Sequence, residues 1–213
     1  MGVQSKINNS ARFTNLYLVM QIKTLPLLFL AFIVSLSTTA QSYEKQYDIC
    51  SESLSKLKII DSIYFDLLYK RNDCLAGSYA PNFVATTINN QVLELAKLKG
   101  KVVMLNFWFV RCQACIKEMP DLNKLAALYP ESKVVFISFA PEGPDTLKKF
   151  LKQTPFNFKT VANSEKIRRD KFKLFSIWPY SILIDKEGKI SKMIIGPDGD
   201  IFQYYKTLID QLL

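Results

Sequence analysis

Two cysteines three residues apart, Cys112 and Cys115, are the residues of this chain best suited to chemistry. Thiols at this spacing can close a disulfide with each other, and so exchange electrons with another disulfide. They follow a strand-length apolar run at 101–109 and precede apolar residues spaced three and four apart, which predicts a buried strand and then an amphipathic helix. The unpaired N–H groups and the dipole of a helix N-terminus stabilise a thiolate. The pattern therefore predicts a reactive thiol with a pKa of about 3.5–7.5, below the usual value of about 8.5.

The sequence contains no histidine. This excludes histidine-ligated metals, haem attachment through a C-x-x-C-H motif, and any Cys-His or Ser-His catalytic pair. The four cysteines could together hold zinc, but an oxidising compartment would favour thiol–disulfide chemistry. We therefore expect no metal and no cofactor.

The segment before residue 41 predicts export. Lys23 precedes an apolar run at 24–36, and small residues follow at 37–40, as in a secretory signal peptide. We expect cleavage after Ala40, with retention as an N-terminal anchor as the alternative, since the run is short for a membrane span of about 20 residues. A complete signal peptide begins at Met20, so we expect residues 1–19 to reflect a misassigned start. The predicted address is the periplasm or cell envelope, with membrane contact only through this segment.

The chain is basic, with 28 Lys and Arg against 19 Asp and Glu and a net charge of +9. These cations are dispersed except at 166–173, where they alternate with apolar residues at helical spacing. This pattern is typical of a solvated helix face, and we expect no nucleic-acid partner.

The remaining periodicity predicts an α/β architecture. After the signal peptide at 1–40, residues 41–77 form a helical extension with an amphipathic helix at 51–69, and residues 78–213 form the main domain. Alternating βαβ units indicate a mixed central sheet flanked by helices. The predicted strands are 82–87, 91–93, 101–107, 133–139, 158–161, 180–185 and 189–195, and the helices are 112–129, 143–153, 164–175 and 200–213.

Several motifs of residues 78–213 resemble the thioredoxin superfamily, specifically the exported TlpA/ResA-type thiol-disulfide oxidoreductases. A C-x-x-C between strand and helix, with a proline before a hydrophobic strand about 65 residues later, is a specific signal. The resemblance implies a thioredoxin-like fold. The matching motifs are Ala-Pro-Asn-Phe at 80–83, Leu-Lys-Gly-Lys at 98–101, Asn-Phe-Trp at 106–108, Cys-Gln-Ala-Cys at 112–115, Lys-Glu-Met-Pro at 117–120 and Trp-Pro-Tyr-Ser-Ile-Leu-Ile-Asp at 178–185.

The resemblance implies a role for each matching residue. Cys112 is the attacking thiol and Cys115 the buried resolving thiol. Pro179 is a cis-proline beside the dithiol, where the backbone of residue 178 pairs with an incoming peptide. Glu118 matches an acidic position of ResA-type members and shares a helix face with Cys115, so it could take the Cys115 proton. A solvated helix glutamate is the alternative. Asn106 stands where thioredoxin has a buried aspartate, and an amide cannot transfer that proton.

The chain departs from the family pattern around the dithiol. Arg111 replaces a common tryptophan, and its charge should favour the Cys112 thiolate. Ala114 stands where proline is frequent, and Trp178 where smaller residues are common. We expect Trp108, Arg111 and Trp178 to form the substrate-binding edge, with core packing as the alternative for Trp108.

Cys50 and Cys74 flank the predicted N-terminal helix. We expect them to form a structural disulfide that closes a loop of about 25 residues and contributes about 3–4 kcal/mol. A second redox pair, or two unpaired thiols, are the alternatives.

The function predicted from these residues and this resemblance is an exported thiol-disulfide oxidoreductase that acts on disulfide-containing proteins. The family favours a reductant that a membrane or exported thiol donor recharges, in a pathway such as cytochrome maturation. One alternative is a peroxiredoxin-like peroxidase, although Phe109 stands where that family has a threonine. Another is a thioredoxin-like binding module without redox turnover, which docks partners or holds a soft metal such as Cu(I).

Overall fold

The computed structural model describes residues 42–54 and 63–213. The predicted signal peptide, and the middle of the helix predicted at 51–69, lie outside the described residues. In these two ranges, no helix combines the length and the apolar character needed to cross a membrane.

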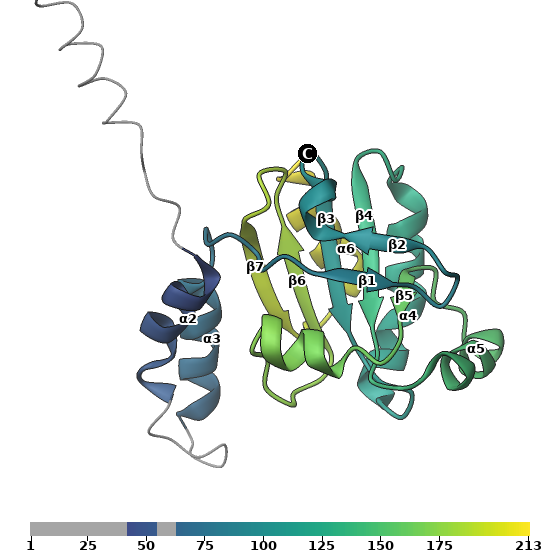
Figure 1. The fold of residues 1–213 in the computed structure, drawn as a ribbon, viewed down its shortest axis with the longest axis horizontal. Coiled ribbons are helices and arrows are strands. Elements are labelled where there is room, and N and C mark those ends of the chain that lie inside the picture. Colours follow the sequence, from purple (N-terminus) through teal and green to yellow (C-terminus); the bar gives the residue numbers. More distant parts are fainter. Residues whose placement is uncertain (1–41, 55–62) are drawn as a thin grey trace, which may run out of the picture. The chain divides into compact units, whose positions relative to one another are not determined.

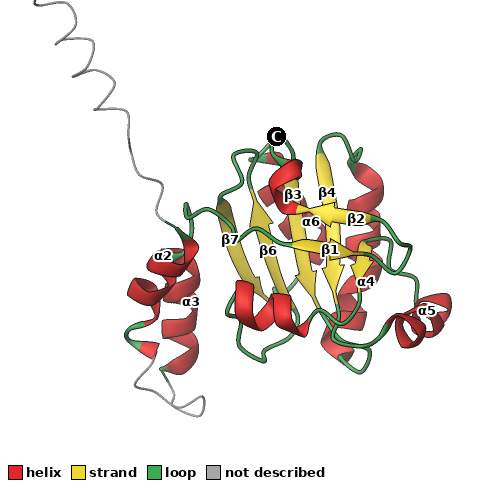
Figure 2. Cartoon of the chain, viewed as in Figure 1, coloured by secondary structure: helices red, strands yellow, loops and turns green. Residues whose placement is uncertain are grey.

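A five-stranded mixed sheet forms the centre of the main domain (Figure 2). Its strand order is β5–β4–β3–β6–β7, in which β3, β4 and β5 are parallel and β6 and β7 run antiparallel to their neighbours. Every residue of β3, β4 and β6 is buried, because both faces of the sheet are covered. The strands are β3 (Val102–Phe107), β4 (Val134–Phe139), β5 (Lys159–Val161), β6 (Tyr180–Ile184) and β7 (Ile190–Ile195).

The two faces of this sheet belong to two separate cores. Alternate residues of β3 point to opposite faces, so Met104 packs in the core with α4 and α6 while Leu105 packs in the other. The second face is covered by a small antiparallel hairpin of β1 and β2 and by the segment at 167–174 (Figure 1). The elements concerned are β1 (Val84–Thr86), β2 (Val92–Glu94), the 3-10 turn η2 (Leu95–Leu98), α4 (Gln113–Leu128), α5 (Pro144–Gln153) and α6 (Ile201–Asp210).

In its described residues, the N-terminal extension contains two helices where we predicted one. These are α2 (Tyr43–Ser51) and α3 (Tyr64–Cys74), which together we call the N-terminal hairpin. A disulfide joins Cys50 to Cys74, with Cα atoms 5.8 Å apart. The prediction of a helix at 51–69 is therefore wrong in its bounds, because α2 ends at Ser51, where the predicted helix would begin, and α3 continues to Cys74.

The helix predicted at 164–175 is also shorter than expected. Only a π-helical turn, η3 (Ile167–Lys171), forms there. Its Arg168 donates from Nη1 to the carbonyl oxygen of Leu174 at 2.6 Å, which closes the chain back on itself, and both Phe172 and Leu174 are buried in the core. The remaining predicted strands and helices are confirmed within a few residues at their ends, and so is the mixed sheet flanked by helices.

Candidate active site

The two central cysteines lie where β3 gives way to α4. The turn at 109–112 is closed by a hydrogen bond from the Cys112 N–H to the Phe109 carbonyl oxygen at 3.0 Å. Cys112 is the N-cap of α4, and its Sγ accepts the Cys115 N–H at 3.1 Å. The two sulfurs form a disulfide that is almost buried, with Cα atoms 5.2 Å apart. A thiolate at Cys112 would be stabilised by the Cys115 N–H group and by the dipole of α4.

A carboxylate that the sequence did not reveal supports this turn. Glu142 follows β4, and its Oε1 accepts the Val110 N–H at 2.9 Å. Its Oε2 is buried and has no hydrogen-bond partner among the described residues. Nothing in the local sequence marks Glu142, because the contact joins residues that lie 32 positions apart.

Glu118 lies inside the protein on the first turns of α4. Its side chain is 5 % exposed, and its Oε2 has no hydrogen-bond partner in the described part of the chain. Burial in an apolar environment raises the pKa of Glu118 to about 7. Burial, together with the smaller effect of the Glu118 charge, raises the pKa of Tyr205 on α6. A carboxyl group with a pKa near neutrality can both accept and release a proton. The burial of Glu118 contradicts the alternative of a solvated helix glutamate.

Asn106 is the next-to-last residue of β3, and its amide side chain cannot accept or release a proton as a carboxyl group does. Its Nδ2 donates to the Ser181 Oγ at 3.0 Å, and both side chains are buried. The two residues are partners in the β3–β6 register, so this hydrogen bond fixes the two strands at the level of the site. β3 therefore supplies no carboxyl group at this level of the sheet.

The Trp178–Pro179 bond is cis and lies at the start of β6. Tyr180 pairs with Phe107, the last residue of β3, so this bond and the turn before the cysteines are at the same end of the sheet. The Trp178 ring contacts the Phe109 ring edge to face at 5.5 Å, and the Arg168 guanidinium lies over it at 5.1 Å. The structure thus brings the dithiol, Glu118 and the Trp178–Pro179 bond together.

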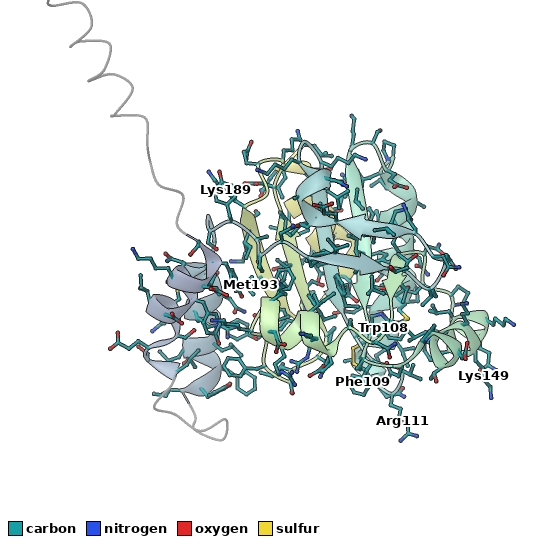
Figure 3. The ribbon with its side chains drawn as sticks, in the orientation of Figure 1. Trp108, Phe109, Arg111, Lys149, Lys189 and Met193 are labelled. Atoms are coloured by element: carbon teal, nitrogen blue, oxygen red, sulfur yellow. A yellow bond between two sulfur atoms is a disulfide. The ribbon has the colours of Figure 1, made fainter. Side chains whose placement is uncertain are left out.

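Arg111 and Trp108 differ sharply in exposure. Arg111 is exposed and extends into solvent from the turn that holds the cysteines, near the yellow disulfide in Figure 3. Trp108 is fully buried, and its ring packs against Phe150 at 5.5 Å and Phe156 at 5.9 Å. A side chain without exposed surface does not contact a substrate, so Trp108 is a packing residue and not the substrate-binding residue that we predicted.

Pro120 lies inside α4, shortly after Glu118. Proline has no N–H group, so the hydrogen bond that residue 120 would donate to the Ile116 carbonyl is missing. Both cysteines and Glu118 precede this break, and half of the helix follows it.

The described cysteines all form disulfides, so none is available as a metal ligand in this state. Among the residues that the structure describes, no group of three or more Cys, Asp or Glu side chains is placed to hold a metal ion.

Comparison with known proteins gives concordant relatives. Residues 76–193 match the AhpC/TSA family. The chain is similar to the thiol-disulfide oxidoreductase ResA of Bacillus cereus, with 41% identity over 124 residues that make up 56% of this chain and 69% of the relative. It is also similar to the ResA of Bacillus subtilis (strain 168), with 31% identity over 136 residues, 63% of this chain and 75% of the relative.

Two solved structures resemble the fold. One is the thioredoxin domain of a thiol-disulfide oxidoreductase from Bacteroides vulgatus, with a TM-score of 0.55 and 24% identity over 63% of this chain and 97% of that domain. The other is a thioredoxin-family thiol:disulfide interchange protein from Chlorobium tepidum TLS, with a TM-score of 0.53 and 25% identity over 62% of this chain and 95% of that protein.

Proposed function

Because the chain belongs to the AhpC/TSA family, and is a thiol-disulfide oxidoreductase with a thioredoxin-like fold, we propose that it acts outside the cytoplasm as a reductant of protein disulfides. The observation that carries this proposal is the Cys112–Cys115 disulfide at the N-terminus of α4, with the buried Glu118 one turn further along the same helix.

The proposed reaction begins with the reduced protein. The Cys112 thiolate attacks one sulfur of a substrate disulfide, the substrate S–S bond breaks, and the first substrate thiolate leaves and takes up a proton. Cys115 then gives its proton to Glu118 and attacks the Cys112 sulfur of the mixed disulfide. The second substrate thiolate leaves and is protonated in turn. The substrate gains two electrons, and the protein becomes the Cys112–Cys115 disulfide.

We propose that an extended peptide binds along the Trp178–Pro179 edge. The backbone of residue 178 would pair with the peptide, Pro179 would shape the edge, and Trp178 and Arg111 would flank the reacting sulfur. Arg111 is exposed and Trp178 is half-buried, so both side chains present surface to a substrate. Arg111 adds a positive charge that favours the Cys112 thiolate.

The proposed address is the periplasm or cell envelope. The signal-like pattern at 20–40 supports export, and an oxidising compartment would preserve the Cys50–Cys74 disulfide, which we propose to be structural. A reductant in such a compartment needs electrons from elsewhere, so we propose a membrane-bound or exported thiol donor. Its substrates would be exported proteins, in a process such as cytochrome maturation.

A redox titration of the Cys112–Cys115 pair against dithiothreitol or glutathione tests this proposal, with a Cys50→Ser/Cys74→Ser variant beside the wild type. We expect a reversible two-electron transition near the thioredoxin potential of about −270 mV. A potential near about −120 mV would instead make the protein an oxidant. Absence of a reversible transition, or rapid consumption of hydrogen peroxide by Cys112, would overturn the proposed reaction.

A further inference from the structure

The segment at 172–179, which we call the substrate loop, carries the Trp178–Pro179 bond but has little regular structure. Its backbone N–H groups make local bonds, from Leu174 to the Arg168 carbonyl oxygen at 3.1 Å and from Ile177 to that of Phe175 at 2.8 Å. Within the described residues, no strand pairs with this loop. One backbone bond ties the end of the loop to the chain after β7, from the Gly196 N–H to the Pro179 carbonyl oxygen at 3.1 Å, and side-chain contacts with other elements hold the rest.

The N-terminal hairpin supplies many of these contacts. At the start of the loop, the Tyr43 hydroxyl of α2 donates to the Phe172 carbonyl oxygen at 2.5 Å. In the middle, the Tyr64 ring of α3 meets the Phe175 ring edge to face at 5.9 Å. Leu54, Tyr64 and Leu68 form a small core of their own, against which Phe175 and Ile177 pack. The hairpin thus holds the loop up to the residue before Trp178.

Arg71 of α3 makes the central connection. Its side chain is 1 % exposed, and in the described ranges no carboxylate pairs with it. Its guanidinium lies 4.9 Å from the centre of the Phe175 ring, and its Nη2 donates to the Tyr180 hydroxyl at 3.1 Å. A buried cation is costly unless its surroundings compensate it. Aromatic faces and two oxygen acceptors of Nη2 do so in part here, while Nε and Nη1 of Arg71 have no hydrogen-bond partner among the described residues. Arg71 therefore contacts residues on both sides of the Trp178–Pro179 bond.

A second hydrogen bond makes this connection rigid. The Tyr180 hydroxyl donates to the Asn72 Oδ1 at 2.6 Å, and the same oxygen accepts from the Arg71 Nη2 at 2.8 Å. Three side chains, two from α3 and one from β6, thus form a closed buried network. Such a network defines one geometry, because a displaced member leaves its partners unpaired.

We propose that the N-terminal hairpin is a positioning element for the substrate loop, and that Arg71 is the residue that joins the two. The inference rests on the proposed function in one respect, namely that a peptide binds along the Trp178–Pro179 edge. The contacts described reach the loop and β6 but not the cysteines. The hairpin therefore acts on peptide binding and leaves electron transfer at the dithiol unchanged.

The Cys50–Cys74 disulfide takes part in this arrangement. Tyr43 lies on α2 and Arg71 on α3, so both contacts are made together only while the two helices keep their relative position. The disulfide joins the end of α2 to the end of α3, and the Gln46 amide donates to the Cys50 Sγ at 3.3 Å and to the Cys74 carbonyl oxygen at 3.2 Å. The hairpin is thereby a closed unit that presents both contacts at once.

The test compares two disulfide substrates. One is an extended peptide whose single cysteine forms a mixed disulfide with glutathione, and the other is hydroxyethyl disulfide, which has no peptide backbone. In Arg71→Met we expect KM for the peptide to rise about tenfold, and in Tyr43→Phe, which loses one hydroxyl, about threefold. We expect kcat for the peptide, kcat/KM for hydroxyethyl disulfide and the dithiol potential to stay at the wild-type values.

Tyr129→Phe is the matched control for Tyr43→Phe. It also removes a hydrogen-bonded hydroxyl group. The Tyr129 hydroxyl donates to the Asp210 Oδ1, and neither residue belongs to the substrate loop or to the N-terminal hairpin. We expect it to leave KM for the peptide unchanged. If Arg71→Met does not fold, Tyr43→Phe still decides the question.

The results separate this inference from the proposed function. An unchanged peptide KM in the folded variants would overturn the positioning role alone, and so would an equal loss with both substrates. If the wild-type protein reduces hydroxyethyl disulfide but not the peptide, the proposed function fails, and the inference fails with it.

Discussion

The two disulfides of this protein are chemically the same bond in two different settings. Cys112 and Cys115 are three residues apart at a helix N-terminus, with a buried carboxyl group on the same helix. Cys50 and Cys74 are 24 residues apart and join the ends of two helices, with a glutamine amide beside them. In the function that we propose, the first setting couples the bond to thiolate stabilisation and proton transfer, while the second constrains the chain. The surroundings of a disulfide, and not the bond itself, thus decide what it does.

The largest difference between the two pairs should appear in turnover. Cys112→Ser removes the attacking thiol, and we expect it to lose disulfide reduction by several orders of magnitude. Cys115→Ser should instead accumulate a mixed disulfide with the substrate, visible as an added mass under non-reducing conditions. Cys50→Ser/Cys74→Ser should keep wild-type kcat on hydroxyethyl disulfide. A loss of that activity in the latter variant would remove the distinction between the two disulfides.

Stability should show the opposite ranking. Removing the disulfide between Cys50 and Cys74, which are 24 residues apart, increases the conformational entropy of the unfolded chain. We therefore expect the double serine variant to lose about 3–4 kcal/mol of unfolding free energy. Reduction of the wild-type Cys112–Cys115 bond, which closes a much shorter loop, should cost less. Urea titrations of the oxidised and selectively reduced proteins measure both values. An equal loss for the two pairs would contradict a structural role confined to Cys50–Cys74.

Glu118 should make the setting of the active-site disulfide dependent on pH. The pKa of Glu118 is about 7 in the folded protein and about 4.5 in the unfolded chain. Between these pH values the carboxyl group is ionised in the unfolded chain but still protonated in the folded protein. Stability should therefore fall as the pH rises through this window and level off above about pH 7. Glu118→Gln removes this fall, and we expect it to be more stable than the wild type by up to about 3 kcal/mol near pH 8 and nearly equal below about pH 4.5.

Glu187→Gln is the control for this prediction, because Glu187 is an exposed glutamate in the turn between β6 and β7. We expect its unfolding free energy to follow the wild-type pH dependence. A flat wild-type profile between about pH 5 and pH 8 would show that Glu118 is not the titrating group.

The smallest effect should come from Arg111. This side chain is exposed, so solvent screens its charge, and its influence on the neighbouring thiolate is weak. We expect Arg111→Gln to slow alkylation of reduced Cys112 by iodoacetamide about two- to threefold near pH 6 at low salt. The difference should shrink in about 1 M salt, where the Debye length falls to about 3 Å. A difference that salt leaves unchanged would indicate a change of shape and not of charge.

The main domain was predictable because its signals are local. The apolar run before Cys112, the helical spacing after it, and the proline before β6 all lie within short windows, and the structure places strands and helices there within a few residues. The family resemblance then identified the fold, which the solved relatives share. The spacing of Glu118 from Cys115 indicated a shared helix face, but its burial depends on α6, which lies far along the chain.

The parts that sequence analysis missed depend on contacts between distant residues. α2 begins at Tyr43, whose hydroxyl donates to the Phe172 carbonyl oxygen over a separation of 129 residues. η3 stays short because Arg168 donates to the Leu174 carbonyl oxygen. Trp108 looked like a site residue because it stands beside the cysteines, yet packing against α5 buries it. A sequence pattern does not contain these pairings.

The missing hydrogen bond at Pro120 divides α4 into two parts with different strengths of attachment. The first part carries Cys115 and Glu118 and has the Cys112–Cys115 disulfide as an additional fastening. When that bond is reduced, the first part keeps its backbone bonds and the packing of Cys115 and Met119 in the core but loses its covalent link to Cys112. We expect it to open more readily as a local unit than the part after Pro120. Amide hydrogen exchange should therefore accelerate at 113–119 on reduction and remain slow at 121–128. The redox state of the Cys112–Cys115 pair would then change the dynamics of a single helical segment.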